Sequence, residues 1–161
     1  MTVYFDSSVF LSVLNGDSSA QQIRFLLADL QKEKTKICTS IITIQEVSVG
    51  CYRLGSIAAD NHGYVKKLAR IEGVTRDVAL TAAKLEARII DDFKGKATEK
   101  QLDNKRRKWD CFHIATAQCL KCASLYTLDL AMLNRQSRLE IKGIKFSLPG
   151  PLNLDLFTNL P

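Results

Sequence analysis

Short apolar runs alternate along this chain with segments of helical periodicity, and this alternation limits the fold more than any other feature. Five runs rich in β-favouring residues predict strands at residues 3–5, 36–39, 71–74, 124–128 and 144–147. The segments between them repeat apolar residues at helical spacing, as in Ile23, Leu26, Leu27 and Leu30. Strands connected by helices favour a parallel sheet with helices on both faces. The sequence therefore predicts an α/β fold with a five-stranded, mostly parallel sheet.

Capping residues mark where several of these helices begin. Ser40 and Thr75 each precede a segment with a clear apolar stripe, and their hydroxyls are suited to bind the first backbone N–H groups of a helix. A further helix, rich in alanine and free of glycine and proline, is expected over residues 111–122. Asp110 is expected at the N-terminus of that helix.

The length and composition indicate one globular domain. The chain has 161 residues, of which 46% are hydrophobic and 25% are charged. No linker or repeat divides it, so we predict a single domain over 1–148 and an irregular C-terminal tail over 149–161, which opens with Pro149-Gly150-Pro151. We see no run of about 18 apolar residues and no secretion signal. Five cysteines without framework spacing agree with a reducing compartment, so a cytoplasmic protein is predicted.

Most of the net charge of +6 comes from one segment. Between Lys94 and Lys108, seven basic residues accompany two acids, which gives this segment a charge of +5. One basic segment on a nearly neutral body is typical of a contact with a polyanion, although a solvated loop is the alternative. The candidate phosphate contacts nearest to Trp109-Asp110 are Lys105, Arg106, Arg107 and Lys108.

Four acidic residues are expected at or near one edge of the sheet. Asp6 follows the first predicted strand, and Asp129 follows the fourth. Glu46 lies in the helix after the second strand, away from its apolar stripe, and Asp110 opens the helix that leads to the fourth. Ligands of parallel sheets bind outside the carboxyl ends of the strands. The four acids are therefore candidates for one common site.

Each acid also has a structural interpretation. Asp6, Asp110 and Asp129 precede helices, and aspartate is a favoured N-cap residue. Glu46 follows Thr43 by three residues, which is the spacing of a capping box. Taken singly, none of these positions is specific for a functional site.

Four segments, taken together and in order, resemble the motifs of the PIN domain family. They are residues 4–11 (YFDSSVFL), 39–47 (TSIITIQEV), 109–117 (WDCFHIATA) and 125–129 (LYTLD). Their order and spacing resemble the family from about residue 2 to 147. This resemblance implies a three-layer α/β/α fold around the parallel sheet, and endonucleolytic cleavage of RNA with Mg²⁺ or Mn²⁺. The acids that match the catalytic and metal-binding positions of the family are Asp6, Glu46, Asp110 and Asp129.

The resemblance implies further residues and partners. Ser8 and Thr127 match positions where the family often has a polar side chain that orients the site. A VapC-type toxin of a toxin–antitoxin pair is one role that it implies, with a homodimer and an antitoxin protein as partners and the basic residues 105–108 as RNA contacts. The chain departs from the family after the fourth motif, because Leu130-Ala131-Met132-Leu133 offers no further acid. A second metal position is therefore left open.

The chemistry of such a site follows from its charges. Four converging carboxylates repel one another, so a cation or protons must neutralise them. Mg²⁺ and Mn²⁺ prefer carboxylate oxygens, and a bound ion can activate water and stabilise charge on a phosphate.

Two other functions are compatible with parts of this pattern. A phosphoryl-transfer domain would use Asp6 as its nucleophile, but Asp6-Ser7-Ser8 lacks the second aspartate that such a phosphatase needs. A non-catalytic RNA-binding module would gain nothing from four acids that face phosphate.

A zinc site in the helix at 111–122 is not expected. Cys111 and Cys122 would lie about 16 Å apart along one helix, too far to share an ion. We interpret all five cysteines as free thiols. His113 follows Asp110 by three residues and could lie on the same face, but a packing or surface role is favoured.

Overall fold

A five-stranded sheet runs through the centre of the molecule. The computed structural model describes residues 1–55, 58–92 and 107–151. Its strands have the order β3-β2-β1-β4-β5, and every neighbouring pair is parallel. They are β1 (Thr2–Phe5), β2 (Lys36–Ser40), β3 (Arg70–Glu72), β4 (Ser124–Tyr126) and β5 (Lys145–Ser147). The prediction of a five-stranded parallel sheet is confirmed.

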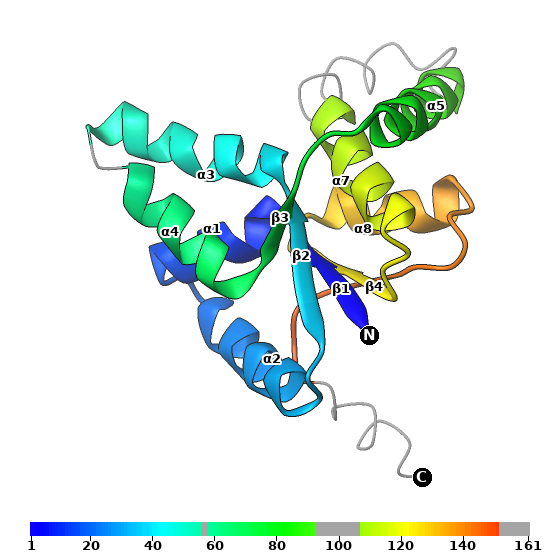
Figure 1. Cartoon of the computed structure of the whole chain (residues 1–161). Coiled ribbons are helices and arrows are strands. Elements are labelled where there is room, and N and C mark those ends of the chain that lie inside the picture. The colour runs from blue at the N-terminus through cyan, green and yellow to red at the C-terminus, as the bar shows by residue number, and fades with distance from the viewer. Residues whose placement is uncertain (56–57, 93–106, 152–161) are drawn as a thin grey trace, which may run out of the picture.

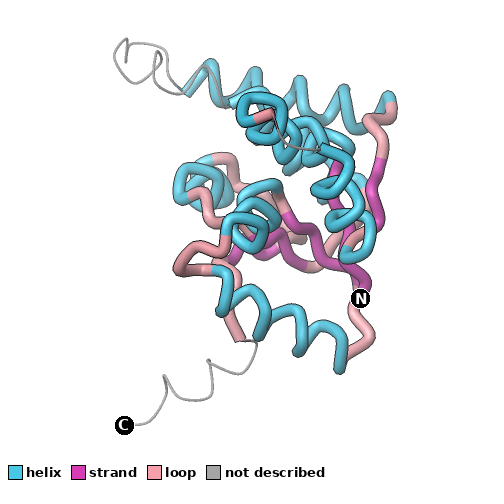
Figure 2. Tube along the Cα trace, turned by 90° about the vertical axis from the view of Figure 1, so that its left-hand side faces the viewer, coloured by secondary structure: helices cyan, strands magenta, loops and turns pink. Residues whose placement is uncertain are grey.

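Helices cover both faces of this sheet, as the α/β/α prediction requires (Figure 1). One face carries α1 (Ser7–Asn15), α2 (Ala20–Lys32), α3 (Ile41–Leu54) and α4 (Ala58–Leu68). The other carries α5 (Arg76–Asp92), α7 (Arg107–Cys119) and α8 (Leu130–Arg138). Figure 2 shows the strands enclosed between the helices of the two layers.

Alternation along the strands divides the core into two halves. Successive side chains of a strand point to opposite faces. Accordingly, Tyr4 of β1 packs with the α5, α7 and α8 layer, whereas Val3 and Phe5 pack with the α1 to α4 layer. All three are at most 1% exposed, so β1 is buried on both faces. The polar residue that directly follows this strand, Asp6, is thereby held at the edge of the core.

The predicted helix starts are confirmed at two positions and wrong at a third. Ser40 caps α3, because its side chain accepts a hydrogen bond from the Ile42 amide, and Thr75 accepts one from the Val78 amide before α5. The alanine-rich helix begins at Arg107, not at residue 111. Asp110 is therefore in its first turn and is not its N-cap. Arginine and lysine are good helix formers, which explains the earlier start.

Two predictions fall wholly or mostly outside the described residues. The division into a domain at 1–148 and a tail at 149–161 stays a prediction, because the description ends at residue 151. Most of the basic segment at 94–108 also lies outside it, including Lys105 and Arg106. Arg107 begins α7, and Lys108 in the same turn is exposed. No helix in the described part of the chain is long and apolar enough to cross a membrane.

Candidate functional site

The four predicted acids line one cavity at the carboxyl edge of the sheet. Asp6 and Asp129 are the N-cap residues of α1 and α8, directly after β1 and close after β4, while Glu46 and Asp110 come from α3 and α7. The cavity has a volume of about 250 Å³. Its lining consists of these four acids together with Ser7, Ser8, Leu11, His113 and Met132. Because parallel strands end at the same edge, residues 123 positions apart along the chain meet here.

Asp6 is held at both of its carboxylate oxygens. Oδ1 accepts hydrogen bonds from the Ser8 amide at 3.0 Å and the Ser8 hydroxyl at 2.6 Å, and from the Val9 amide at 3.4 Å. Oδ2 accepts one from the Thr127 hydroxyl at 2.6 Å. Burial raises the pKa of Asp6, while the nearby His113 and these hydroxyl groups act in the opposite direction. The carboxylate is thus fixed in position although it is only 2% exposed.

Ser8 and Thr127 connect this carboxylate to the start of α8. The Leu128 amide donates to the Ser8 hydroxyl at 2.8 Å, and the Asp129 amide donates to the Thr127 hydroxyl at 2.9 Å. Each hydroxyl therefore accepts from the backbone after β4 and donates to Asp6. Ser8 and Thr127 thus link the Asp6 carboxylate to the backbone that leads into α8.

Glu46 is held by a histidine from α7. His113 Nε2 lies 2.8 Å from Oε2 of Glu46, and Nδ1 lies 2.7 Å from the Tyr4 hydroxyl. The Tyr4 oxygen also accepts a hydrogen bond from the Ser40 amide, so the ring of His113 connects Glu46 to a hydroxyl that is itself bound to the backbone before α3. Burial raises the pKa of Glu46. The hydrogen bond with His113 and the electrostatic attraction of that ring lower the pKa by more, so the net shift is downward.

Asp110 makes a buried ion pair. Nε and Nη2 of Arg135 donate to its Oδ2 at 3.0 and 2.9 Å. Burial raises the pKa of Asp110 to about 6; Arg135 and, more weakly, His113 oppose this shift, and the charge of Asp129 adds to it. Asp110 is therefore ionised at neutral pH and gains a proton more readily than an exposed aspartate.

This raised pKa predicts a pH dependence of the metal-free protein. The folded state binds the proton of Asp110 more tightly than the unfolded chain does, so the free energy of unfolding falls as the pH rises from about 4 to 6. The expected contribution is on the order of 3 kcal/mol, because one pKa unit corresponds to about 1.4 kcal/mol. Thermal unfolding in EDTA across this range measures it, and Asp110→Asn should remove this part of the slope. An unchanged slope in the variant would assign the effect to other groups.

The structural interpretations of the acids hold for two of the four. Asp6 and Asp129 both cap helices, and Oδ1 of Asp129 accepts the Ala131 and Met132 amides. Glu46 makes no capping box in this structure, because Ser40 caps α3 and Glu46 binds His113. A carboxylate can cap a helix and line the acidic cavity at the same time. In Asp6 and Asp129 the capping hydrogen bonds go to Oδ1, and Oδ2 is not used for capping.

The donor set suits a hard divalent ion that keeps part of its water. In the residues that the structure describes, no three carboxylate, histidine or cysteine side chains already form a metal-binding group. His113 and Arg135 each engage one carboxylate oxygen, of Glu46 and of Asp110 respectively, and these hydrogen bonds do not involve the second oxygen of either acid. Mg²⁺ usually needs only one or two direct carboxylates and keeps several waters. A cavity of about 250 Å³ has room for them, since one water needs roughly 10–15 Å³.

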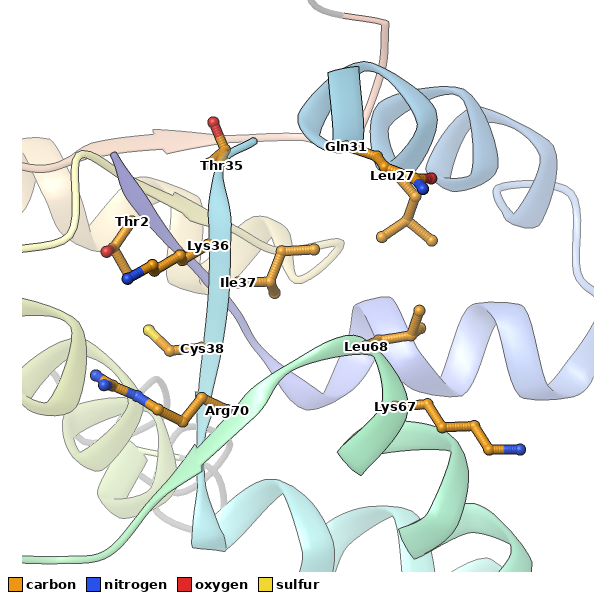
Figure 3. A pocket seen from close by; sticks show the side chains of 10 residues that line it. All are labelled: Thr2, Leu27, Gln31, Thr35, Lys36, Ile37, Cys38, Lys67, Leu68 and Arg70. Atoms are coloured by element: carbon orange, nitrogen blue, oxygen red, sulfur yellow. The ribbon is translucent and has the colours of Figure 1, made fainter. Parts of the chain in front are cut away.

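A larger cavity lies at the opposite edge of the sheet and differs in chemistry. Its volume is about 780 Å³, and side chains on both sides of β2 line it (Figure 3). Lys36, Lys67 and Arg70 contribute to this lining, which contains no acid among the described residues. It cannot hold a divalent cation on carboxylates, so the smaller acidic cavity is the candidate site.

Three residues of the site were missed or undervalued in the sequence. Tyr4 and His113 anchor Glu46, and Arg135 binds Asp110. His113 is 1% exposed, which agrees with the packing role favoured from the sequence. That interpretation left out the hydrogen bonds of the ring to Tyr4 and Glu46. Arg135 had a signal, because it follows the apolar Met132 by three residues and precedes Leu139 by four. That spacing places an arginine on the buried stripe of α8.

The fold and the cavity define a three-layer α/β/α domain with a carboxylate site at the strand ends. Residues 3–137 match the family model of the PIN domain, so the chain belongs to the PIN domain family. Proteins of this family are nucleases and generally use divalent metal ions. No curated protein matches the chain as a relative.

Solved structures of toxin–antitoxin systems share this fold. A toxin–antitoxin complex from Klebsiella pneumoniae is 19% identical, with a TM-score of 0.56 over 88% of this chain and 94% of that chain. A chain of VapBC2 from Rickettsia felis, bound to a DNA fragment from its promoter, is 14% identical. Its TM-score is 0.56, over 92% of this chain and 98% of that chain. Mycobacterium tuberculosis VapC20, a toxin that cleaves the sarcin–ricin loop, is 18% identical. Its TM-score is 0.51, over 81% of this chain and 92% of that chain. At these identities the likeness shows the fold alone.

Proposed function

We propose that this chain is a divalent-metal-dependent endoribonuclease that uses Mg²⁺ or Mn²⁺. The observation that carries the proposal is the meeting of Asp6, Glu46, Asp110 and Asp129 in one cavity of a PIN domain. These acids come from four separate elements, so chance capping or solvation does not account for their common location. Nuclease activity in this family supports the reaction class.

The proposed mechanism assigns a part to each side chain. The four carboxylates would hold the ion, directly or through water, and the ion would activate water for attack and stabilise charge on the phosphate. Ser8 and Thr127 fix both oxygens of Asp6, and His113 fixes Glu46. Oxygens that are already positioned need little rearrangement when the ion and the substrate bind, which lowers the free-energy cost of reaching the transition state.

The proposed substrate is RNA held by its phosphates. The segment from Lys94 to Lys108 carries a charge of +5 and ends in the first turn of the helix that bears Asp110. Lysine and arginine there would make phosphate contacts that do not depend on base sequence and that weaken with salt. Lys108 is exposed and next to this helix start. RNA is proposed rather than DNA because VapC20, which has the same fold, cleaves the sarcin–ricin loop.

We also propose that the chain is the toxin of a toxin–antitoxin pair. Its fold is shared with proteins that were solved as toxin–antitoxin complexes, including VapBC2. The proposed partners are a second copy of the chain and an antitoxin protein that covers the acidic cavity, and the proposed place of action is the cytoplasm.

A chelator experiment tests the proposed reaction. Purified protein is expected to cut RNA internally in Mn²⁺, to lose this activity in EDTA, and to regain it when Mn²⁺ is restored. Gel analysis of an end-labelled RNA distinguishes internal cuts from removal of single nucleotides. Phosphate release from a small ester would instead support phosphoryl transfer by Asp6. Salt-sensitive RNA binding without cleavage, at any metal concentration, would contradict the proposal and support a binding module.

A further inference from the structure

Arg135 is a buried arginine beside the acidic cavity. It lies on the inner face of α8 with Met132 and is 4% exposed. Arginine is almost never fully buried unless it is paired, and its guanidinium keeps its proton in proteins. A fixed positive charge therefore lies inside the protein at this position.

The guanidinium is directed at one acid of the site. Nε and Nη2 of Arg135 donate to the same oxygen, Oδ2 of Asp110, at 3.0 and 2.9 Å. Asp110 is 6% exposed and lines the acidic cavity, whereas Arg135 is absent from the described lining. The arginine thus lies behind Asp110 and engages one of its two carboxylate oxygens with two hydrogen bonds.

The charges of the site lead to a limit on its metal content. Counting the acids and the arginine alone, four carboxylates contribute −4 and Arg135 contributes +1. One divalent ion brings this sum to −1, whereas two ions bring it to +1 and place the second beside a fixed positive charge. Like charges in a buried site repel strongly, because the low dielectric hardly screens them. The arginine and a second divalent ion would therefore compete for Asp110.

We propose that Arg135 is a positioning residue that takes the place of a second divalent ion beside Asp110, so that the acidic cavity binds one divalent ion per chain. The inference rests on the proposed function, since it concerns the same acids. It assigns to the chain a one-ion site in which the guanidinium supplies the remaining positive charge and holds Asp110 in place.

Counting bound Mn²⁺ tests this inference without any measurement of activity. Metal-free full-length protein is titrated with Mn²⁺, and the free ion is followed by electron paramagnetic resonance. Wild type is expected to bind one Mn²⁺ per chain. Arg135→Gln, which frees Asp110 from the guanidinium and removes its charge, is expected to bind two. Arg135→Lys keeps the charge and is expected to bind one.

A second arginine on the same helix provides the control. Arg138→Gln removes an equal charge from an exposed position of α8 and is expected to bind one Mn²⁺. Circular dichroism checks that each variant is folded, and Arg135→Met, which removes the charge with an unbranched side chain, is expected to bind two Mn²⁺ and replaces Arg135→Gln if that variant is unfolded.

The outcomes separate this inference from the proposed function. Two Mn²⁺ in wild type, or one in a folded Arg135→Gln, overturn the role of Arg135 and leave a metal-dependent nuclease intact. No bound Mn²⁺ in wild type overturns the inference and the proposed function together.

Discussion

Asp6→Asn is expected to lower Mn²⁺-dependent RNA cleavage by more than about 100-fold, because even the outer-shell partners of metal ligands are typically worth 10–100-fold. The substitution removes the negative charge that the ion needs and changes the shape of the side chain very little. The asparagine oxygen can still accept from the Ser8 and Val9 amides, and its NH₂ group can donate to the Thr127 hydroxyl. The fold is therefore expected to survive, and circular dichroism with thermal unfolding checks it.

Asp17 offers a matched control for this variant. It is also an aspartate near a helix start, and its Oδ1 accepts from the Ser12 hydroxyl and the Ser19 amide. It is exposed and does not line the acidic cavity in the described structure. Asp17→Asn is expected to retain wild-type cleavage. Activity in Asp6→Asn comparable to that of Asp17→Asn would remove Asp6 from the mechanism.

His113→Ala is expected to lower the free energy of unfolding by about 2–4 kcal/mol, because it leaves a cavity in the core and removes the buried hydrogen bonds of the ring. The ring is 1% exposed and joins the Tyr4 hydroxyl to Glu46. Without it, the Tyr4 hydroxyl loses its hydrogen bond to the ring, and Glu46 loses the group that orients it. Urea unfolding measures the change in stability, and RNA cleavage at a temperature where the variant is folded measures the loss of orientation.

The only other histidine of the chain serves as the comparison. His62 is exposed in α4, so His62→Ala is expected to change stability by less than about 0.5 kcal/mol. Stability of His113→Ala equal to that of His62→Ala would show that the chain of hydrogen bonds from Tyr4 to Glu46 contributes nothing to the fold.

The strands could be predicted because their patterns are local. A run such as Val3-Tyr4-Phe5 needs burial on both faces, and only a central strand of a covered sheet provides it. Helix starts could be predicted where a capping hydroxyl precedes the helix, as Ser40 precedes α3. The predicted start of α7 was wrong, because the basic residues before Asp110 extend the helix to Arg107. No capping pattern in the sequence marks that position.

The sequence by itself determined which acids would meet. Asp6 and Asp129 follow β1 and β4, which are neighbours in the sheet, and parallel strands bring their carboxyl ends to one edge whatever the lengths of the connections. Only the tertiary structure decided how those acids are held. The contacts of Glu46 with His113 and of Asp110 with Arg135 join residues 67 and 25 positions apart. Helical spacing gives the direction of a side chain but not its distance from another element, and hydrogen bonds and ion pairs depend on tenths of an ångström.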